Sequence, residues 1–396
     1  MKRRMRVGIF TDTYYPEISG VATSVYELRN SLIEAGQEVF VFTVSNHEVD
    51  PTDSSETHVY RIPSMPFVTL KERRIGIPIL KNYLKIIKKF NLDLIHTHTE
   101  FSLGGLGKRA AAKFNLPHIH TYHTLYENYM HYLKIPENDF TYSLVGKFIK
   151  KFTKNCDLII VPTEKVIDSM RGYKVERPLK VIPTGLDLDK FRNIDWKKVE
   201  EIRSRYEIKS DDTVLISICR VSQEKKLDQI IRFFHELSKT TSKIKLMIVG
   251  DGPAKTELEE LSTEFGLNDK VVFTGYADWE RIQDYYAAGN IFVSASQSET
   301  QGLTYAEALS TGIPILVRQD DCLKDVLYHK ENGYGFTNKD DFIRGFHYIN
   351  DKLAEDSSWG SHSEIFSKQD FIDTIISTYE EVCSNHKEVF LKNRLG

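Results

Sequence analysis

The chain has 396 residues, of which 41% are hydrophobic and 28% charged, with a formal net charge of −3. This length favours two domains that each bury a core, and the composition excludes disordered and collagen-like chains. Residues 1–180 carry 26 Lys and Arg against 19 Asp and Glu, so the first half is basic and the remainder acidic. The imbalance favours an anionic partner for the first half, with an ordinary solvated surface as the alternative.

The four cysteines form no Cys-x-x-Cys pair, and we expect reduced thiols in a cytoplasmic protein. The basic start MKRRMRVGIF is followed by too short an apolar run for a signal peptide. No apolar stretch approaches the roughly 20 residues that span a bilayer. We therefore expect any membrane contact to be peripheral.

Short apolar runs alternate with helical patterns along the first half. Periodicity predicts helices over 21–35 and 103–114, and buried strands over 7–11, 39–43, 94–97, 118–122, 158–162 and 181–183. After a turn-rich segment at 184–189 the alternation restarts, with strands over 214–219, 245–249, 271–274, 291–294 and 313–317. A final helix is predicted over about 371–386. The pattern is typical of two doubly wound parallel α/β lobes with a cleft between them, and ligands of such sheets bind beyond the carboxyl ends of the strands.

Two strand ends in the first half carry candidate binding residues. Gly20 falls where a loop enters the first long helix, a position at which backbone N–H groups can bind an anion. A tight turn without a ligand is the alternative. His123 follows the fourth strand and is the histidine of His118-Ile-His-Thr-Tyr-His that points beyond the sheet. A structural histidine is equally compatible, and the ligand cluster of a metal site is absent.

The second half places cations and turns after its strands. Arg220 and Lys225 lie on a loop before a helix, where they can clamp a diphosphate. Gly250 lies in the turn Gly-Asp-Gly-Pro, and Tyr276 follows the next strand, where an aromatic ring can pack on a nucleobase. Each feature also has a purely structural interpretation.

The segment from Glu299 to Glu307 carries the most information. Gly302 falls where a helix begins, so the amides of Gln301, Gly302, Leu303 and Thr304 favour a phosphate. The two carboxylates suit sugar or ribose hydroxyls, which donate hydrogen bonds. Amides for phosphate beside carboxylates for hydroxyls indicate a nucleotide-sugar site.

Together these motifs resemble the retaining glycosyltransferase family 4, which has the two-lobed GT-B fold. The paired glutamates, the Arg220 to Lys225 loop and the Gly20 loop carry the likeness, which extends over nearly the whole chain. Cys219 and Lys226 stand where the family usually has glycines. The first lobe is similar to bacterial 1,2-diacylglycerol 3-glucosyltransferases in four segments: 11–16, 19–24, 96–104 and 120–127.

The resemblance implies transfer of glucose from UDP-glucose to 1,2-diacylglycerol with an α-linked product. It implies that Arg220 and Lys225 hold the diphosphate, that Glu307 binds the ribose, and that Glu299 and His123 lie at the transferred glucose. No cofactor or metal is implied as a requirement, although a divalent cation could stimulate. By the same likeness, residues 1–185 form the acceptor and membrane lobe, with a helix at about 371–396 packing back on it. Residues 186–370 form the donor lobe.

A lipid acceptor requires a membrane-binding segment, and residues 71–90 combine cations with apolar residues. The candidate cations are Arg73, Arg74, Lys81, Lys85, Lys88 and Lys89. They predict peripheral attachment to an anionic surface at the inner face of the cell membrane. An amphipathic helix packed on its own sheet is the alternative.

Three other functions remain open at this point. They are transfer to a soluble polysaccharide or protein acceptor, a sugar-nucleotide epimerase of the same architecture, and a binding subunit without activity. We expect no nucleic-acid partner, and the sequence does not specify an oligomeric state.

Overall fold

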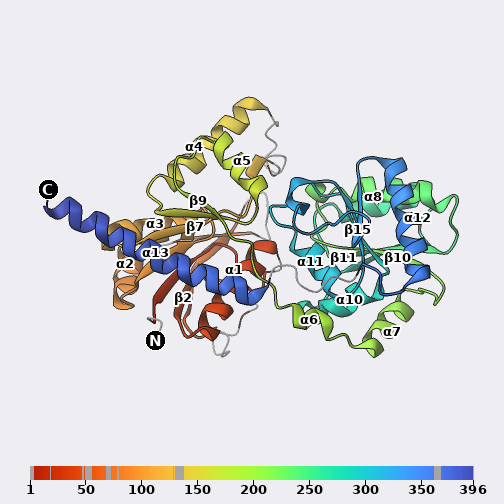
Figure 1. Cartoon of the computed structure of the whole chain (residues 1–396), viewed down its shortest axis with the longest axis horizontal. Coiled ribbons are helices and arrows are strands. Elements are labelled where there is room, and N and C mark those ends of the chain that lie inside the picture. Colours follow the sequence, from red (N-terminus) through yellow and green to blue (C-terminus); the bar gives the residue numbers. More distant parts are fainter. Residues whose placement is uncertain are drawn as a thin grey trace. The chain divides into compact units, whose positions relative to one another are not determined.

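A computed structural model describes residues 4–17, 19–46, 49, 56–67, 73–77, 80–127, 129, 138–360 and 367–395. The chain divides into two compact units, each built around one parallel sheet (Figure 1). The first unit comprises Met1–Gly185 and Lys368–Gly396, and the second comprises Leu186–Ser367. The predicted α/β class with two Rossmann-like sheets is therefore confirmed.

The first sheet has seven strands in the order β3-β2-β1-β6-β7-β8-β9, and its neighbouring strands run parallel. Its strands are β1 (Arg6–Phe10), β2 (Glu38–Val44), β3 (Val59–Ile62), β6 (Leu94–Thr97), β7 (His118–Thr121), β8 (Leu158–Val161) and β9 (Leu179–Val181). A separate antiparallel pair is formed by β4 (Ser64–Pro66) and β5 (Arg74–Gly76). Six of these strands were predicted within about two residues, whereas β3, β4 and β5 were not.

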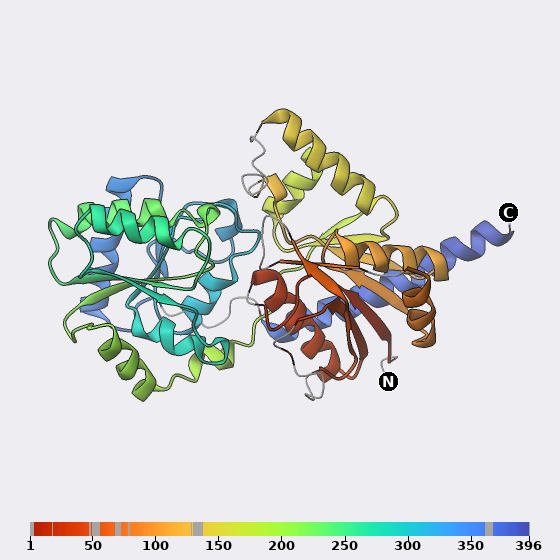
Figure 2. The same cartoon turned by 180° about the vertical axis from the view of Figure 1, so that it is seen from behind.

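Helices cover both faces of the first sheet because its strands are apolar on both sides. Val7 and Ile9 of β1 face one core with Val25 of α1 and Ile375 of α13, whereas Phe10 faces the other. Figures 1 and 2 show this unit and its helices from opposite sides. The helices of this unit are α1 (Gly20–Glu34), α2 (Leu80–Lys89), α3 (Ser102–Phe114), α4 (Asp139–Thr153), α5 (Glu164–Gly172) and the long α13 (Lys368–Leu395).

The second sheet has six parallel strands in the order β12-β11-β10-β13-β14-β15. They are β10 (Thr213–Ile218), β11 (Ile244–Val249), β12 (Val271–Gly275), β13 (Ile291–Ser294), β14 (Ile315–Arg318) and β15 (Gly333–Phe336). Its helices are α6 (Leu188–Arg192), α7 (Trp196–Arg205), α8 (Leu227–Ser238), α9 (Lys255–Glu264), α10 (Ile282–Ala288), α11 (Leu303–Ser310) and α12 (Lys339–Glu355). Counted within the unit, the order is 3-2-1-4-5-6, that of dinucleotide-binding folds.

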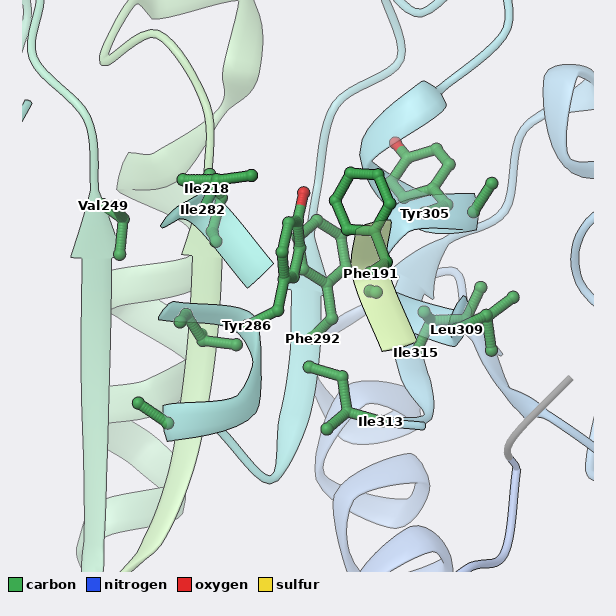
Figure 3. Close-up of a cluster of buried hydrophobic side chains, with 14 of the residues drawn as sticks. Phe191, Ile218, Val249, Ile282, Tyr286, Phe292, Tyr305, Leu309, Ile313 and Ile315 are labelled. Atoms are coloured by element: carbon green, nitrogen blue, oxygen red, sulfur yellow. The ribbon is translucent and has the colours of Figure 1, made fainter. Parts of the chain in front are cut away.

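The core on one face of the second sheet is rich in aromatic residues. Figure 3 shows Phe191, Tyr286, Phe292 and Tyr305 together, with aliphatic side chains of the strands around them. The Tyr286 and Phe292 rings lie 5.9 Å apart, and those of Phe292 and Tyr305 lie 5.8 Å apart. This packing fixes α10 and α11, which carry residues of the candidate site.

Each sheet has a point where the strand order reverses, which we call its switch point. It lies between β1 and β6 in the first sheet and between β10 and β13 in the second. Loops that leave these strand pairs diverge to opposite faces, which opens a crevice for ligands at that edge of a sheet. The candidate residues 12–20 and 98–100 follow β1 and β6, and 220–225 and 299–302 follow β10 and β13.

Candidate functional site

An ion pair joins the two loops at the switch point of the second unit. Lys225 Nζ lies 2.6 Å from Glu299 Oε1, and both side chains are partly buried. Lys225 ends a 3₁₀ turn after β10, and Glu299 lies on the loop after β13. Two residues that the sequence placed at one site are therefore in direct contact, 74 positions apart.

Arg220 lies on the same loop, and a buried carboxylate is close to it. Arg220 Nη1 is 3.9 Å from Glu224 Oε1, and Ser222 donates to that carboxylate over 2.6 Å. Burial raises the pKa of the neighbouring Cys219 thiol to about 11, so this thiol is protonated at neutral pH. The loop that carries Arg220 and Lys225 is therefore held in place by hydrogen bonds within it.

Gly302 is the residue before α11, as predicted, and its backbone is left-handed with φ of 73°. A Cβ atom at this position would lie 2.3 Å from the Tyr305 ring, so a larger residue would be strained and would also clash. Leu303 and Thr304 form the first turn of α11, where backbone amides lack intrahelical acceptors. The turn thus has the geometry of an anion-binding helix start.

Glu307 lies inside α11, and its side chain is buried. Tyr286 of α10 donates a hydrogen bond to Glu307 Oε2 over 2.7 Å. Burial, together with the nearby carboxylate, raises the pKa of Tyr286 well above its usual value, so the phenol remains a donor. Tyr286 could not be selected from the sequence, because a tyrosine inside a helix has the pattern of any core residue.

Gly250 lies where the carboxyl ends of β10, β11 and β12 meet. Its N–H donates to the Gly275 carbonyl over 2.9 Å, its φ is 131°, and a Cβ would lie 2.0 Å from the Cys219 carbonyl oxygen. Its glycine requirement is thus explained by packing within the protein. Tyr276 comes directly after Gly275 and is exposed, so its ring is accessible at this edge of the sheet.

Asp12 connects the two loops at the switch point of the first unit. Its buried carboxylate accepts hydrogen bonds from Thr99 Oγ1 at 2.7 Å, from the Leu103 amide and from the Ser102 hydroxyl. Burial raises the pKa of Asp12, and these hydrogen bonds oppose the rise. Asp12 therefore fixes the start of α3 against the end of β1. Asp12 was not among the residues selected from the sequence, although its position directly after the first predicted strand was an available signal.

His123 contacts a second histidine that sequence reasoning did not select. His98 Nδ1 lies 2.9 Å from His123 Nε2, and the two rings are stacked. Burial lowers the pKa of His123 to about 3 and that of His98 well below its usual value, so both rings are neutral at physiological pH. His98 Nε2 is buried and has no hydrogen-bond partner among the described residues. The position of His98, one residue after β6, was the sequence feature from which it could have been selected.

Further buried histidines lie next to the pair formed by His98 and His123. His96 contacts Tyr379 of α13 at 2.6 Å and Thr121 at 2.7 Å, and His120 Nε2 lies 3.1 Å from Glu100 Oε1. The Tyr126 hydroxyl donates to the other oxygen of Glu100. The carboxyl ends of β6 and β7 therefore carry a connected set of imidazoles, hydroxyls and one carboxylate.

Gly20 is the first residue of α1, and Ser19 caps the helix by accepting from the Ala22 amide. A Cβ atom on Gly20 would meet nothing within 4 Å, in contrast to Gly250. Packing within the described protein therefore gives no reason for glycine at position 20.

The candidate membrane cations divide into two groups. Arg73 pairs with Glu17 and contacts Thr13, and Arg74 donates to Ser64, so both arginines have partners within the protein. On α2, by contrast, the lysines are exposed: Lys81, Lys85, Lys88 and Lys89. Residues 71, 72, 78 and 79 of the predicted segment lie outside the described residues.

The described residues contain neither a membrane-spanning helix nor a metal-binding cluster. No helix there is both long enough and apolar enough to cross a membrane. In the same part of the chain, no group of three or more His, Cys, Asp or Glu side chains is arranged to hold a metal ion.

Comparison with known proteins finds a matching family for each half of the chain. Residues 18–190 match the family Glycosyltransferase Family 4, and residues 198–357 match Glycosyl transferases group 1. The chain is 39% identical over 331 residues to an alpha-monoglucosyldiacylglycerol synthase of Streptococcus pneumoniae, covering 83% of this chain and 74% of the relative. It is 33% identical over 373 residues to an alpha-monoglucosyldiacylglycerol synthase of Acholeplasma laidlawii, covering 92% and 93%.

Solved structures with the same fold include Anabaena HepE in complex with UDP-glucose, with a TM-score of 0.70 at 15% identity over 98% of this chain and 100% of the other. Another is WaaG, a glycosyltransferase involved in lipopolysaccharide biosynthesis, with a TM-score of 0.70 at 14% identity over 95% and 99%. These likenesses establish the fold alone. The matches to the two family models and the identities to the two synthases show more: the chain belongs to the family 4 glycosyltransferases and is a hexosyltransferase with the GT-B fold.

Proposed function

We propose that the chain transfers glucose from UDP-glucose to 1,2-diacylglycerol with retention of configuration, giving 3-O-α-glucosyl-diacylglycerol. The observation that carries the proposal is its identity of 39% and 33% to two proteins named alpha-monoglucosyldiacylglycerol synthase, over most of the chain. The geometry at the switch point of the second unit supports the donor half. A soluble acceptor and a silent binding subunit are the alternative functions.

The leaving group of the proposed reaction is UDP, on which negative charge grows in the transition state. Arg220, Lys225 and the start of α11 lie on the two loops that flank one switch point, and together they supply positive charge and amide donors. Because Lys225 contacts Glu299 at 2.6 Å, a bound diphosphate would compete with that carboxylate for the ammonium group. Glu299 would then accept from the hydroxyls of the glucose.

Glu307 suits the ribose hydroxyls as a rigid acceptor. Tyr286 holds its carboxylate at 2.7 Å within a buried aromatic core, so its orientation is set before the donor binds. Tyr276 offers an accessible ring for the base, and Gln301 to Thr304 contribute backbone amides.

His123 would lie beside the transferred glucose as a hydrogen-bonding group. With a pKa of about 3, it is neutral at physiological pH and does not serve as a general acid. We therefore assign deprotonation of the acceptor hydroxyl to the leaving phosphate, with attack on the face from which UDP departs. Catalysis then rests on positioning and electrostatics.

The proposed acceptor lies in a bilayer, which places the enzyme at an anionic membrane surface. We propose peripheral attachment to the inner face of the cell membrane through the basic first unit. The reaction as written needs no metal and no further cofactor, and no nucleic acid takes part.

Mass spectrometry of the products tests the proposal. Purified enzyme is given detergent-dispersed diacylglycerol and a panel of UDP- and GDP-linked sugars, and the expected product is a monohexosyl lipid from UDP-glucose, with an α anomeric coupling in proton NMR. Transfer only to a polysaccharide or protein would establish the soluble-acceptor alternative. UDP binding without transfer to any acceptor would indicate a silent subunit. Glu299→Ala serves as the inactive control.

A further inference from the structure

We propose that the outer face of α4, together with Phe101, is the surface through which this enzyme enters a lipid bilayer. We call it the α4 surface and define it as Phe101, Phe140, Leu144 and Phe148, with Lys147 and Lys151 beside them. The inference rests on the proposed function because it names how the enzyme reaches a lipid acceptor.

The α4 surface consists of large apolar side chains that face solvent. Phe140 is 71% exposed, Phe101 51%, Leu144 46% and Phe148 42%. Phe140, Leu144 and Phe148 follow the spacing i, i+4, i+8 and so form one stripe on the helix. The core-facing side of α4 is separately filled by Val145, Ile149 and Phe152, so this stripe is additional to what the fold requires.

Aromatic contacts extend the stripe toward the carboxyl ends of the strands. The rings of Phe101 and Phe148 lie 6.1 Å apart, and Tyr126 lies 5.8 Å from Phe101 and 6.5 Å from Phe148. Tyr126 in turn donates to Glu100, which contacts His120. The apolar stripe therefore leads to the edge of the first sheet that carries the candidate site.

The charges around the stripe match an anionic bilayer. Lys147, Lys150 and Lys151 are exposed on α4, and Lys150 pairs with the exposed Glu176. Asp139, in the first turn, is the one acidic residue of the helix sequence. A helix that presents aromatic and leucine side chains next to lysines has the composition of interfacial membrane helices, in which the apolar stripe enters the acyl boundary and the cations meet lipid phosphates.

The described part of the previously predicted segment presents fewer exposed apolar side chains, of which Ile77 is 51% exposed but lies outside α2. On α2, Ile87 is buried, and Tyr83, Leu84 and Phe90 pack against the core of the first unit. Among residues 81–89 of α2, the exposed side chains are those of the lysines, of Asn82 and, at 36%, of Ile86. We therefore assign insertion to the α4 surface and leave α2 a purely electrostatic contribution.

Tryptophan placement in the full-length enzyme measures insertion directly. The three native tryptophans, Trp196, Trp279 and Trp359, all lie in the second unit, so wild-type fluorescence provides the background. Phe140→Trp and Phe148→Trp are mixed with vesicles of phosphatidylglycerol and phosphatidylcholine that carry bromine on the acyl chains. We expect additional quenching and a blue shift for both variants, and neither change for the matched control Ile86→Trp on α2.

Vesicle sedimentation measures the contribution of the stripe to binding. We expect Leu144→Ser/Phe148→Ser to weaken binding to anionic vesicles by about tenfold or more, and Ile86→Ser to leave it unchanged. Circular dichroism melting checks that the variants fold. Transfer to diacylglycerol in detergent micelles should remain near the wild-type rate, because no bilayer is involved.

Two outcomes would overturn the inference. One is wild-type vesicle binding by the double variant together with unquenched tryptophans at positions 140 and 148. The other is dimerisation without lipid that the double variant abolishes, which would make the surface a contact between copies of the chain. Failure of the proposed function is a separate result: the wild-type enzyme would then give no glucosyl lipid in detergent, whatever its vesicle binding.

Discussion

At the scale of single residues, the pairing of Lys225 with Glu299 has a direct kinetic consequence. Removing the ammonium group with Lys225→Ala deletes one of the charges that we assign to the leaving UDP. We expect kcat/KM for UDP-glucose to fall by about 10²- to 10³-fold, the usual cost of losing one preorganised group at a developing charge. Lys225→Arg should keep part of the activity. Steady-state kinetics and calorimetric titration with UDP measure both effects.

Lys226 provides the matched control for this residue. It is the next residue on the loop, is exposed, and has a left-handed backbone with φ of 54°. Lys226→Ala removes the same charge and retains a Cβ atom in that conformation. Equal losses in the two variants would mean that general loop charge, and not the position of Lys225, governs donor binding.

At the scale of elements, β6, β7 and the loops that follow them hold buried histidines that must stay neutral. Burial lowers the pKa of His118 and His123 to about 3 and that of His96 and His98 well below 6.5. Below about pH 6.5 the unfolded chain binds protons that the folded chain does not. The free energy of unfolding should therefore fall as the pH drops from 6.5 toward 3, by about 1 kcal/mol per pH unit for each of His118 and His123, and His96 and His98 act in the same direction.

Urea unfolding across this pH range measures the slope. His118→Gln should make it shallower by about one proton. An identical slope in wild type and His118→Gln would show that His118 is also protonated in the folded chain.

The sequence predicted the central strands well but missed two of the edge strands, β3 and β15. Buried parallel strands such as β6 and β13 are short apolar runs, and their predicted bounds are those observed. By contrast, β3 is half-exposed, and β15 reads Gly-Tyr-Gly-Phe, so neither gives an apolar run. Among the site residues, positions after strands could be predicted. Their partners could not, because Tyr379 contacts His96 from 283 positions away and Tyr286 is an ordinary helix residue by pattern.

At the scale of the whole molecule, the two units differ in how the chain builds them. The second unit is continuous, Leu186–Ser367, and it carries Arg220, Lys225, Glu299 and Glu307. The first unit is completed only when α13 returns to it. The buried face of α13 supplies Phe371, Ile372, Ile375, Ile376, Tyr379 and Val382 to its core. At about 1.5–3 kcal/mol for each buried apolar side chain, losing this face would cost roughly the entire stability of a domain.

A fragment of residues 186–367 should therefore fold and bind UDP, whereas residues 1–185 should not fold without α13. We expect the fragment to bind UDP within about threefold of the full-length affinity, a difference of under 1 kcal/mol, because our donor assignment uses residues of this unit alone. Cooperative thermal unfolding and titration calorimetry measure folding and binding. Lys225→Ala in the fragment is the control and should weaken binding as it does in the full chain. A fragment that unfolds cooperatively but does not bind UDP would mean that the nucleotide also needs groups from the first unit, and Gly20 at the open start of α1 would be the first position to test.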